Sequence, residues 1–177
     1  MSLSTKGGFS VLHHAMLGAS HQLPANLLTF KLLTLADNEG LTPVDVAARS
    51  ANLSGLPIEI LAKAIVAPNK NGATPLHRAA MEGNLNNIPK QLLTVENLLE
   101  KDKFGMSVLL HAVPDPSRLS PFEGCKRKNL DALLGIDLPE STKPMLGNKW
   151  WQENEAVKAS LKISNYKPTN DAELDIF

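Results

Sequence analysis

The sequence predicts an all-α protein in which one helical unit repeats four times and stacks into a solenoid. The first observation is periodic: glycines recur at intervals of 32, 32 and 33 residues, and each opens the same short phrase, as in a repeat array. These glycines are Gly8, Gly40, Gly72 and Gly105. The second observation is the composition. Of the 177 residues, 43% are hydrophobic but only 5% are aromatic, which suits a core of Leu, Ile, Val and Ala.

Each repeated phrase has the features of a helix start. Two positions after the glycine stands a Ser or Thr, which caps a helix by accepting a hydrogen bond from a free backbone N–H of the first turn. The next residue is Val or Pro, and proline is favoured there because its missing N–H would have had no partner. The four capping residues are Ser10, Thr42, Thr74 and Ser107. We therefore predict that a first helix begins directly after each of them.

A proline 16 or 17 residues after each glycine marks a second helix. The four prolines are Pro24, Pro57, Pro89 and Pro121. Apolar runs such as Leu27-Leu28 and Leu92-Leu93 follow them, so we interpret each proline as the first residue of the second helix. The Leu-Leu-Thr sequences also indicate a break, after which Thr29 and Thr94 cap a further short turn. Each unit then consists of a turn, a helix, a loop and a helix.

The third unit resembles the ankyrin repeat. Its segment Asn69-Lys-Asn-Gly72-Ala-Thr-Pro-Leu-His-Arg-Ala-Ala80 contains the Thr-Pro-Leu-His-x-Ala-Ala core of that family, and Gly83 fits the turn after the first helix. The resemblance covers roughly residues 4 to 134 and implies an ankyrin-like solenoid with short hairpin fingers. It divides the segment 1–134 into four repeats, at about 5–36, 37–68, 69–101 and 102–134.

Three further segments are expected after the repeats. Residues 135–147 contain the prolines and polar residues of a linker. Residues 148–164 are predicted to form a helix that caps the array, with Trp150 and Trp151 inserted against the last repeat. The alternative is that the two tryptophans form a knob that binds a partner. Residues 165–177 are expected to be a flexible tail.

The family resemblance implies a non-enzymatic protein–protein interaction module, an adaptor or inhibitor, that binds through a concave face. Fingers around the turn glycines and the outer ends of the first helices form that face. Several of these positions carry large apolar side chains where solvent is expected, and exposed apolar clusters mark interaction sites. The predicted partner-binding residues are Phe9, Leu17, Leu41, Arg49, Met81, Glu82, Phe104 and Met106. The alternative for Phe9 and Met106 is that they fold over the array as end caps.

The final residues resemble the short peptide by which many bacterial replication and repair proteins engage the sliding clamp. They are Glu173, Leu174, Asp175, Ile176 and Phe177. Leu174, Asp175 and Phe177 match that motif, whereas Glu173 replaces a glutamine and so removes an amide donor. The resemblance implies a bacterial or phage protein whose tethered anchor residues enter a hydrophobic pocket of the clamp. The alternative is an acidic tail with an apolar tip that lies back on the protein.

No catalytic, metal or cofactor site is predicted. His13 and His77 occupy the Leu-His position, where the family resemblance implies a structural bond to the backbone of a hairpin turn. Histidines two repeats apart are roughly 20 Å from each other, too far to share a metal. Cys125 stands next to the basic segment 126–128, which lowers a thiol pKa, but no histidine or acid partner is identifiable beside it. An enzyme with an unconventional site near Cys125 is kept as an alternative function.

Charge and targeting signals favour a cytoplasmic monomer. The net charge is zero, so nothing global attracts nucleic acid or an anionic membrane. No apolar run approaches the roughly 20 residues that span a bilayer, and the N-terminus has no signal-peptide core. A single cysteine excludes an internal disulfide and suits a reducing compartment. The alternative is an effector that leaves the cell by specialised secretion and binds a host protein.

Overall fold

The computed structural model describes residues 6–18, 23–113 and 129–164, and within these ranges the regular elements are helices. The all-α class is therefore confirmed. The α-helices are α1 (Val11–Ala15), α2 (Phe30–Leu33), α3 (Pro43–Arg49), α4 (Ile58–Ala64), α5 (Pro75–Glu82), α6 (Val95–Leu99), α7 (Val108–Ala112), α9 (Lys143–Leu146) and α10 (Asn148–Ser164). Single 3-10 turns are η2 (Ala25–Leu27), η3 (Leu85–Asn87), η4 (Lys90–Leu92) and η5 (Glu140–Thr142). A further helical turn covers residues 129–132.

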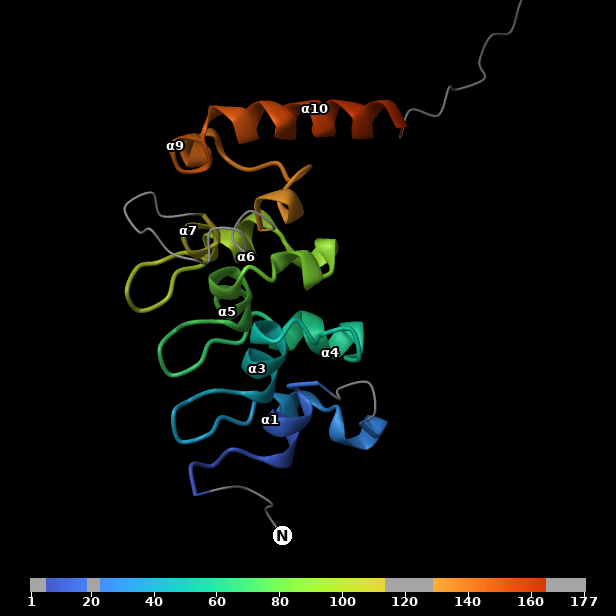
Figure 1. Ribbon diagram of the computed structural model, residues 1–177, viewed down its shortest axis with the longest axis vertical. Coiled ribbons are helices and arrows are strands. Elements are labelled where there is room, and N and C mark those ends of the chain that lie inside the picture. The colour runs from blue at the N-terminus through green and yellow to red at the C-terminus, as the bar shows by residue number, and fades with distance from the viewer. Residues whose placement is uncertain (1–5, 19–22, 114–128, 165–177) are drawn as a thin grey trace, which may run out of the picture.

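The helices stack in two columns, and loops project from one side as fingers (Figure 1). The first helices of successive units pack on one another in the order α1, α3, α5 and α7. The second helices form the other column, in which α2 contacts α4. The fingers are the loops that precede α1, α3, α5 and α7, and they lie on the side of the first column opposite the second helices (Figure 1). This is the layered arrangement of an ankyrin repeat domain.

The four turn glycines adopt the left-handed conformation, which glycine enters without steric cost. The φ angles of the four range from 71° at Gly72 to 86° at Gly40. The conformation itself favours glycine there, because a side chain at such φ angles is strained whatever the space around it. Backbone bonds then join neighbouring fingers, because the N–H of Lys103 donates to the Asn71 carbonyl at 3.0 Å.

The helix starts also follow the sequence prediction. The residues before α1, α3, α5 and α7 are the four predicted caps and have extended backbone. The hydroxyl of Thr42 accepts a hydrogen bond from the N–H of Asp45 at 3.1 Å, and that of Ser107 accepts one from Leu110. At the other end of α5, Gly83 has a φ of 78° and closes the helix with a left-handed turn.

The prolines of the second helices require a correction. Pro57 precedes α4 with a ψ of 133°, so it stands at the cap rather than at the first helical position. Pro24 and Pro89 open only the single turns η2 and η4, because the backbone leaves the helical region at the following Leu-Leu pairs. Thr29 and Thr94 then cap α2 and α6, as the Leu-Leu-Thr pattern indicated. Pro121 lies outside the described residues.

Asparagine side chains donate to carbonyl groups at the C-terminal ends of the first helices. The amide of Asn52 donates to the Met16 carbonyl at 3.1 Å, and that of Asn84 donates to the Arg49 carbonyl at 2.6 Å. Asn129 serves the end of α5 in the same way and is fully buried. These bonds connect each unit to the preceding one, and the sequence analysis did not predict them.

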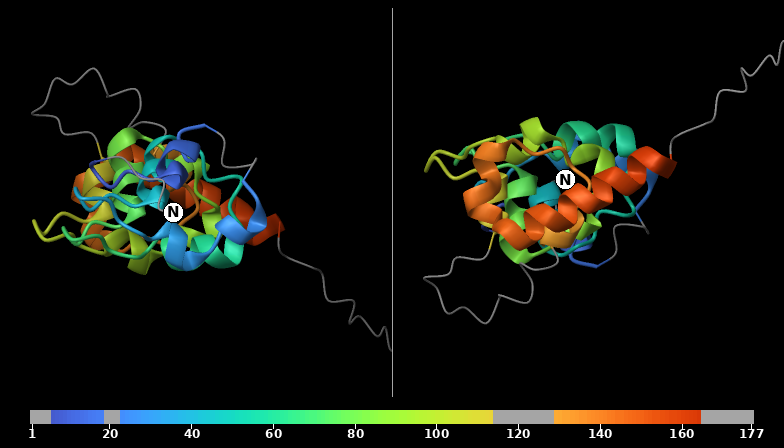
Figure 2. Two further views of the ribbon diagram at one scale, coloured as in Figure 1. Left: turned by 90° about the horizontal axis from the view of Figure 1, so that it is seen from below. Right: turned by 90° about the horizontal axis from the view of Figure 1, so that it is seen from above.

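The segment expected to be a linker, 135–147, contains η5 and α9 and is packed rather than extended. Leu138 and Leu146 are buried in the hydrophobic core because they cover the apolar face of the last repeat. Helix α10 crosses that end of the array (Figure 2). No helix of the described residues combines the length and the apolar character needed to cross a membrane.

The two tryptophans of α10 face the array and do not form a knob. Trp150 is 6% exposed and Trp151 is 9% exposed, and their rings meet edge to face. The indole N–H of Trp150 donates to the Leu130 carbonyl at 2.9 Å. The carboxamide of Asn154, buried beside them, accepts from the N–H of Gly135 and donates to the carbonyl of Ile136. The indole and carboxamide bonds thus fix α10 as the cover of the last repeat.

Candidate functional site

A groove of about 560 Å³ lies between the first two fingers and the first helices of the array. Its lining comes from the fingers (Phe9, Glu39, Leu41), from the end of α1 (Leu17), from α3 and the residue after it (Asp45, Val46, Arg49, Ser50) and from α5 (Arg78). Four of the eight predicted partner-binding residues, Phe9, Leu17, Leu41 and Arg49, therefore line one groove. Asp45, Val46 and Arg78 were not predicted to belong to it.

The row formed by Leu17, Arg49 and Met81 continues the groove along the array. These residues stand 32 positions apart, so they occupy the same place in three consecutive units. Leu17 is 56% exposed and Met81 is 44% exposed. The guanidinium of Arg49 pairs with the carboxylate of Glu82 at 3.1 Å, which joins α3 to α5. A charged pair thus lies in a row with two exposed apolar side chains.

The two remaining predicted residues lie on the finger before α7. Phe104 is 74% exposed, and the ammonium of Lys103 lies 5.0 Å from the centre of its ring. Met106 is half-buried, and its carbonyl accepts a hydrogen bond from His77. Neither residue contributes to the groove lining. In the first finger, the centre of the Phe9 ring lies 4.7 Å from that of the His13 ring. Phe9 also lines the groove.

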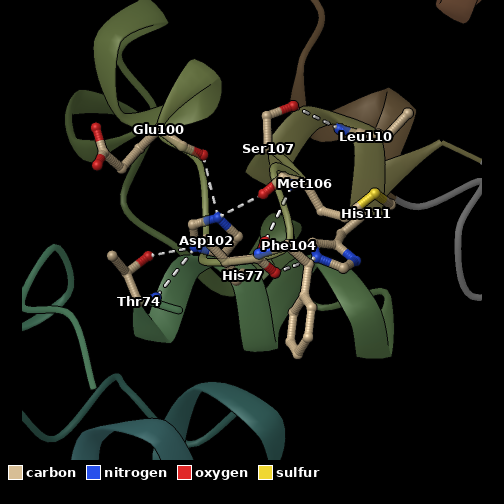
Figure 3. Close-up of polar contacts among 9 residues, drawn as sticks. All are labelled: Thr74, His77, Glu100, Asp102, Phe104, Met106, Ser107, Leu110 and His111. Atoms are coloured by element: carbon tan, nitrogen blue, oxygen red, sulfur yellow. Dashed lines mark hydrogen bonds and ion pairs between the residues drawn. The ribbon is translucent and has the colours of Figure 1, made fainter. Parts of the chain in front are cut away.

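His13 and His77 have the structural role that the resemblance implied. His13 is 1% exposed, and its Nε2 donates to the Leu41 carbonyl in the next finger at 3.0 Å. His77 is fully buried (Figure 3), and its Nε2 donates to the carbonyls of Glu100 and Met106 at 3.1 and 3.2 Å. Burial, together with the nearby His111, lowers the pKa of His77 and keeps the imidazole neutral.

Asp45 takes the histidine position in the second unit and behaves differently. Its Oδ2 accepts two hydrogen bonds from Thr42, one from the N–H and one from the hydroxyl, both at 2.9 Å. Its Oδ1 has no hydrogen-bond partner, although the residue is 1% exposed. Burial raises the pKa of Asp45 even though the Thr42 bonds, the charge of Arg78 and the Asn69 side chain act to lower it. A buried carboxyl group therefore lies against the groove.

Arg78 supplies a cation from α5 to the same groove. Its Nε is buried and has no hydrogen-bond acceptor. The ion pairs of the described residues join Arg49 to Glu82, His111 to Asp102, and Lys158 to two acids, and none includes Arg78. Because a guanidinium stays charged in proteins, Arg78 brings a positive charge to the groove, and this charge acts on Asp45 without an ion pair between them.

The groove residues that were not predicted can be found in the sequence by their position within the repeat, although not by their residue type. Aligning the units on their glycines places Asp45 where two other units have His13 and His77. It places Arg78 one position later, where the second unit has Val46. Positions in the first helix at which one unit carries a different residue from the others, such as 45 and 78, therefore mark the polar part of the groove.

Asp102 organises the finger before α7. Its Oδ1 accepts from the N–H groups of Phe104 and Met106 at 2.9 and 3.0 Å, and its Oδ2 meets Nε2 of His111 at 3.3 Å (Figure 3). Burial acts to raise the pKa of Asp102, but the hydrogen bonds from Met106, His111 and Phe104 outweigh it and lower that pKa. The finger is thereby held in one conformation.

Residues 71–103 match the ankyrin repeat family, and this segment, which includes α5 and α6, is an ankyrin repeat. No curated protein matches the chain. Ankyrin repeats are in general protein-binding modules, and domains built from them are typically non-catalytic. Of the residues that form the groove and the row beside it, Arg78 and Met81 on α5 fall in the matched segment.

Two sets of predicted residues lie outside the part of the chain that the structure describes. They are Cys125 with its basic neighbours 126–128, and the tail motif 173–177. Among the described residues, no three His, Cys, Asp or Glu side chains are grouped so that they could hold a metal ion.

Proposed function

We propose that this protein is a non-enzymatic interaction module, an adaptor or inhibitor, that binds a protein partner through the groove and the adjoining row of first-helix residues. The convergence of Phe9, Leu17, Leu41 and Arg49 in one open groove carries the proposal. Four apolar and five polar or charged residues line the groove, and such a mixture can bury an apolar side chain of another protein and orient it through hydrogen bonds.

Hydrogen bonds within the protein also hold the finger loops of the proposed binding surface in place. The fingers are held by Asp37 and Asp102, each of which accepts two backbone N–H bonds from its own turn. His13 and His77 fix the fingers to the first helices. Association then costs little conformational entropy on the side of this protein, because its loops are ordered before the partner arrives.

Site-specific photocrosslinking tests the proposal. A photoreactive amino acid replaces Leu17 or Met81 on the proposed surface, and Glu59 on α4 serves as the control on the second-helix side. In lysates of cells that naturally express the protein, the first two positions are expected to capture one common partner that Glu59 does not capture. Equal capture from both sides, or capture from Glu59 alone, contradicts the proposal. A host protein as the common partner would identify an exported effector.

A second candidate function concerns the tail. The match of Leu174, Asp175 and Phe177 to the clamp-binding peptide supports a protein that docks on a bacterial sliding clamp. Binding of purified clamp is measured for the full chain and for a chain that lacks residues 173–177. The candidate requires binding by the full chain and its loss on truncation, so absent or unchanged binding contradicts it.

A further inference from the structure

The α1 end of the array exposes apolar side chains at positions that the later units bury. Val11, the first residue of α1, is 52% exposed, whereas the first residues of α3, α5 and α7 are buried. Leu12 and Ala15 are half-buried, although their counterparts in the three later helices are 0% exposed. Because the four helices share one sequence pattern, the difference comes from packing. Among the described residues, the later helices have a cover that α1 lacks.

The repeat itself shows what kind of element fits against these positions. Each later first helix has the preceding one against it, since α3 packs on α1, α5 on α3 and α7 on α5. Helix α1 stands at the end of this column, and α10 covers the other end (Figures 1 and 2). Leu12 and Ala15 are identical to Leu76 and Ala79, which are 0% exposed inside the column. A further helix, packed at the usual distance of about 8–10 Å, would cover the α1 end in the same way.

The first unit carries positive charge without any acid. No Asp or Glu precedes Asp37 in the sequence, and the side chains of Lys6 and Lys31 are exposed. Lys31 follows Phe30, which opens α2 and is 45% exposed, whereas Val95, the first residue of α6, is half-buried. A second copy that met this end with its own α1 end would place lysines against lysines. Acids on a different partner would instead pair with them.

We propose that the α1 end of the array binds an α-helix of a partner protein whose apolar stripe is flanked by Asp or Glu. The stripe packs on Val11, Leu12 and Ala15 as neighbouring first helices pack within the array, and the flanking acids pair with Lys6 and Lys31. None of these five residues lines the groove. The inference therefore goes beyond the proposed function and gives the protein a second binding surface, which an adaptor uses to hold two partners at once.

A peptide selection tests the shape and charge of the occupant. In one half of a phage-displayed library the apolar residues recur at the helical period, and in the other half they alternate with polar ones as in a strand. Flanking positions vary among Glu, Lys and Gln. Peptides are selected on the full chain and depleted on Val11→Glu, a variant that keeps α1 because an acid suits the first turn of a helix. We expect the remaining peptides to have the helical period and acidic flanks. A strand period, basic flanks or no remaining peptide would each overturn the inference.

A charge exchange assigns the flanking acids to the two lysines. Calorimetry measures a selected acidic peptide and its version with Lys in place of the acids on three proteins. These are the wild type, the double variant Lys6→Glu with Lys31→Glu, and a control with the same change of charge, Lys63→Glu with Lys101→Glu. We expect the first double variant to weaken the acidic peptide about fivefold and to strengthen the basic one, while the control does neither. Equal effects of the two double variants would overturn the pairing.

Two other occupants are outcomes of the same set of variants. Sedimentation of the chain alone at increasing concentration detects a second copy, and self-association that Val11→Glu abolishes would overturn the inference. Flotation with vesicles of phosphatidylserine and phosphatidylcholine detects a lipid surface, and Val11-dependent flotation would overturn it as well. We expect neither. The proposed function is decided separately, by crosslinking from Leu17 and Met81, so its failure and the failure of this inference are distinguishable.

Discussion

The units built around α3 and α5 use the same position of the repeat for different purposes. In the α5 unit, His77 accepts from the cap residue and donates to two carbonyls of the next finger. In the α3 unit, Asp45 accepts from its cap but leaves Oδ1 without a partner. An imidazole can accept on one side and donate on the other, whereas a carboxylate can only accept.

Because of this difference, residue 77 contributes mainly to the stability of the fold, whereas residue 45 contributes to the binding surface. The finger before α7 depends on His77 because two of its carbonyls receive bonds from that ring. The finger before α5 is closed by its own bonds, from the N–H of Asn69 to the Ala73 carbonyl and from the N–H of Asn71 to the Asn69 side chain, and no histidine of the described residues donates to its carbonyls. Residue 45 lines the groove, whereas residue 77 is buried beneath the next finger and does not.

The largest effect is expected from removing the imidazole of His77. His77→Ala removes the acceptor of the α5 cap and one donor from each of two finger carbonyls in a fully buried site, and it creates a cavity. We expect a loss of about 3 kcal/mol in the free energy of unfolding, measured by urea denaturation. Asp45→Ala removes the bonds with Thr42 and the interactions with Asn69 and Arg78 from a carboxyl group whose burial is itself unfavourable, and it should cost about 1 kcal/mol. Equal losses for the two variants would contradict the assignment of different roles.

The asparagines that bind the ends of α3 and α5 extend the comparison. Asn129 is fully buried, donates to the Ala80 carbonyl at 2.8 Å and accepts from the N–H of Leu85 at 3.1 Å. Asn84 serves the end of α3 through the Arg49 carbonyl and is half-buried. We expect Asn129→Ala to cost about 2 kcal/mol and Asn84→Ala about 1 kcal/mol. Thermal unfolding of the two variants ranks them, and the reverse order would contradict the role of Asn129.

Local patterns made the repeat architecture predictable from sequence. Turn glycines and caps act within a few residues, so their spacing alone indicates the structure. The carbonyls that His13 and His77 bind lie 23 to 29 residues away, and only the family resemblance implied those bonds. Asn129 was not predictable in this way, because its partners Leu85 and Ala80 are 44 and 49 residues away. Arg78 and Asp45 likewise line one groove only because the units that contain α5 and α3 stack on each other.

The pH dependence of stability should differ in sign between the two units. Burial, followed by the effect of His111, lowers the pKa of His77 from 6.5, so its contribution is complete above pH 6.5 and is lost as the pH falls through that value towards the folded pKa. Burial raises the pKa of Asp45 from 3.8, so its contribution is complete below pH 3.8 and is lost as the pH rises through the folded pKa. Urea denaturation over a pH series measures both.

The variants His77→Gln and Asp45→Asn separate the two contributions. The deficit of His77→Gln relative to the wild type should shrink as the pH falls below 6.5. The stability of Asp45→Asn relative to the wild type should improve as the pH rises from acid to neutral. Difference curves that run parallel for both variants would show that the two positions do not titrate in opposite directions.

The smallest effect on stability, and the clearest test of the binding side of the comparison, comes from Arg49. Its pair with Glu82 joins α3 to α5 at the surface, where such pairs contribute about 0.5 kcal/mol or less. Arg49→Met keeps the apolar stem and should leave the urea midpoint nearly unchanged. It should nevertheless reduce capture of the partner from the Met81 position, because Arg49 lines the groove and stands in the same row of the array as Met81. Glu82→Gln breaks the same pair and keeps the guanidinium, so it serves as the control. If Glu82→Gln reduces capture as much as Arg49→Met does, then the ion pair rather than the arginine itself supports the partner-binding surface.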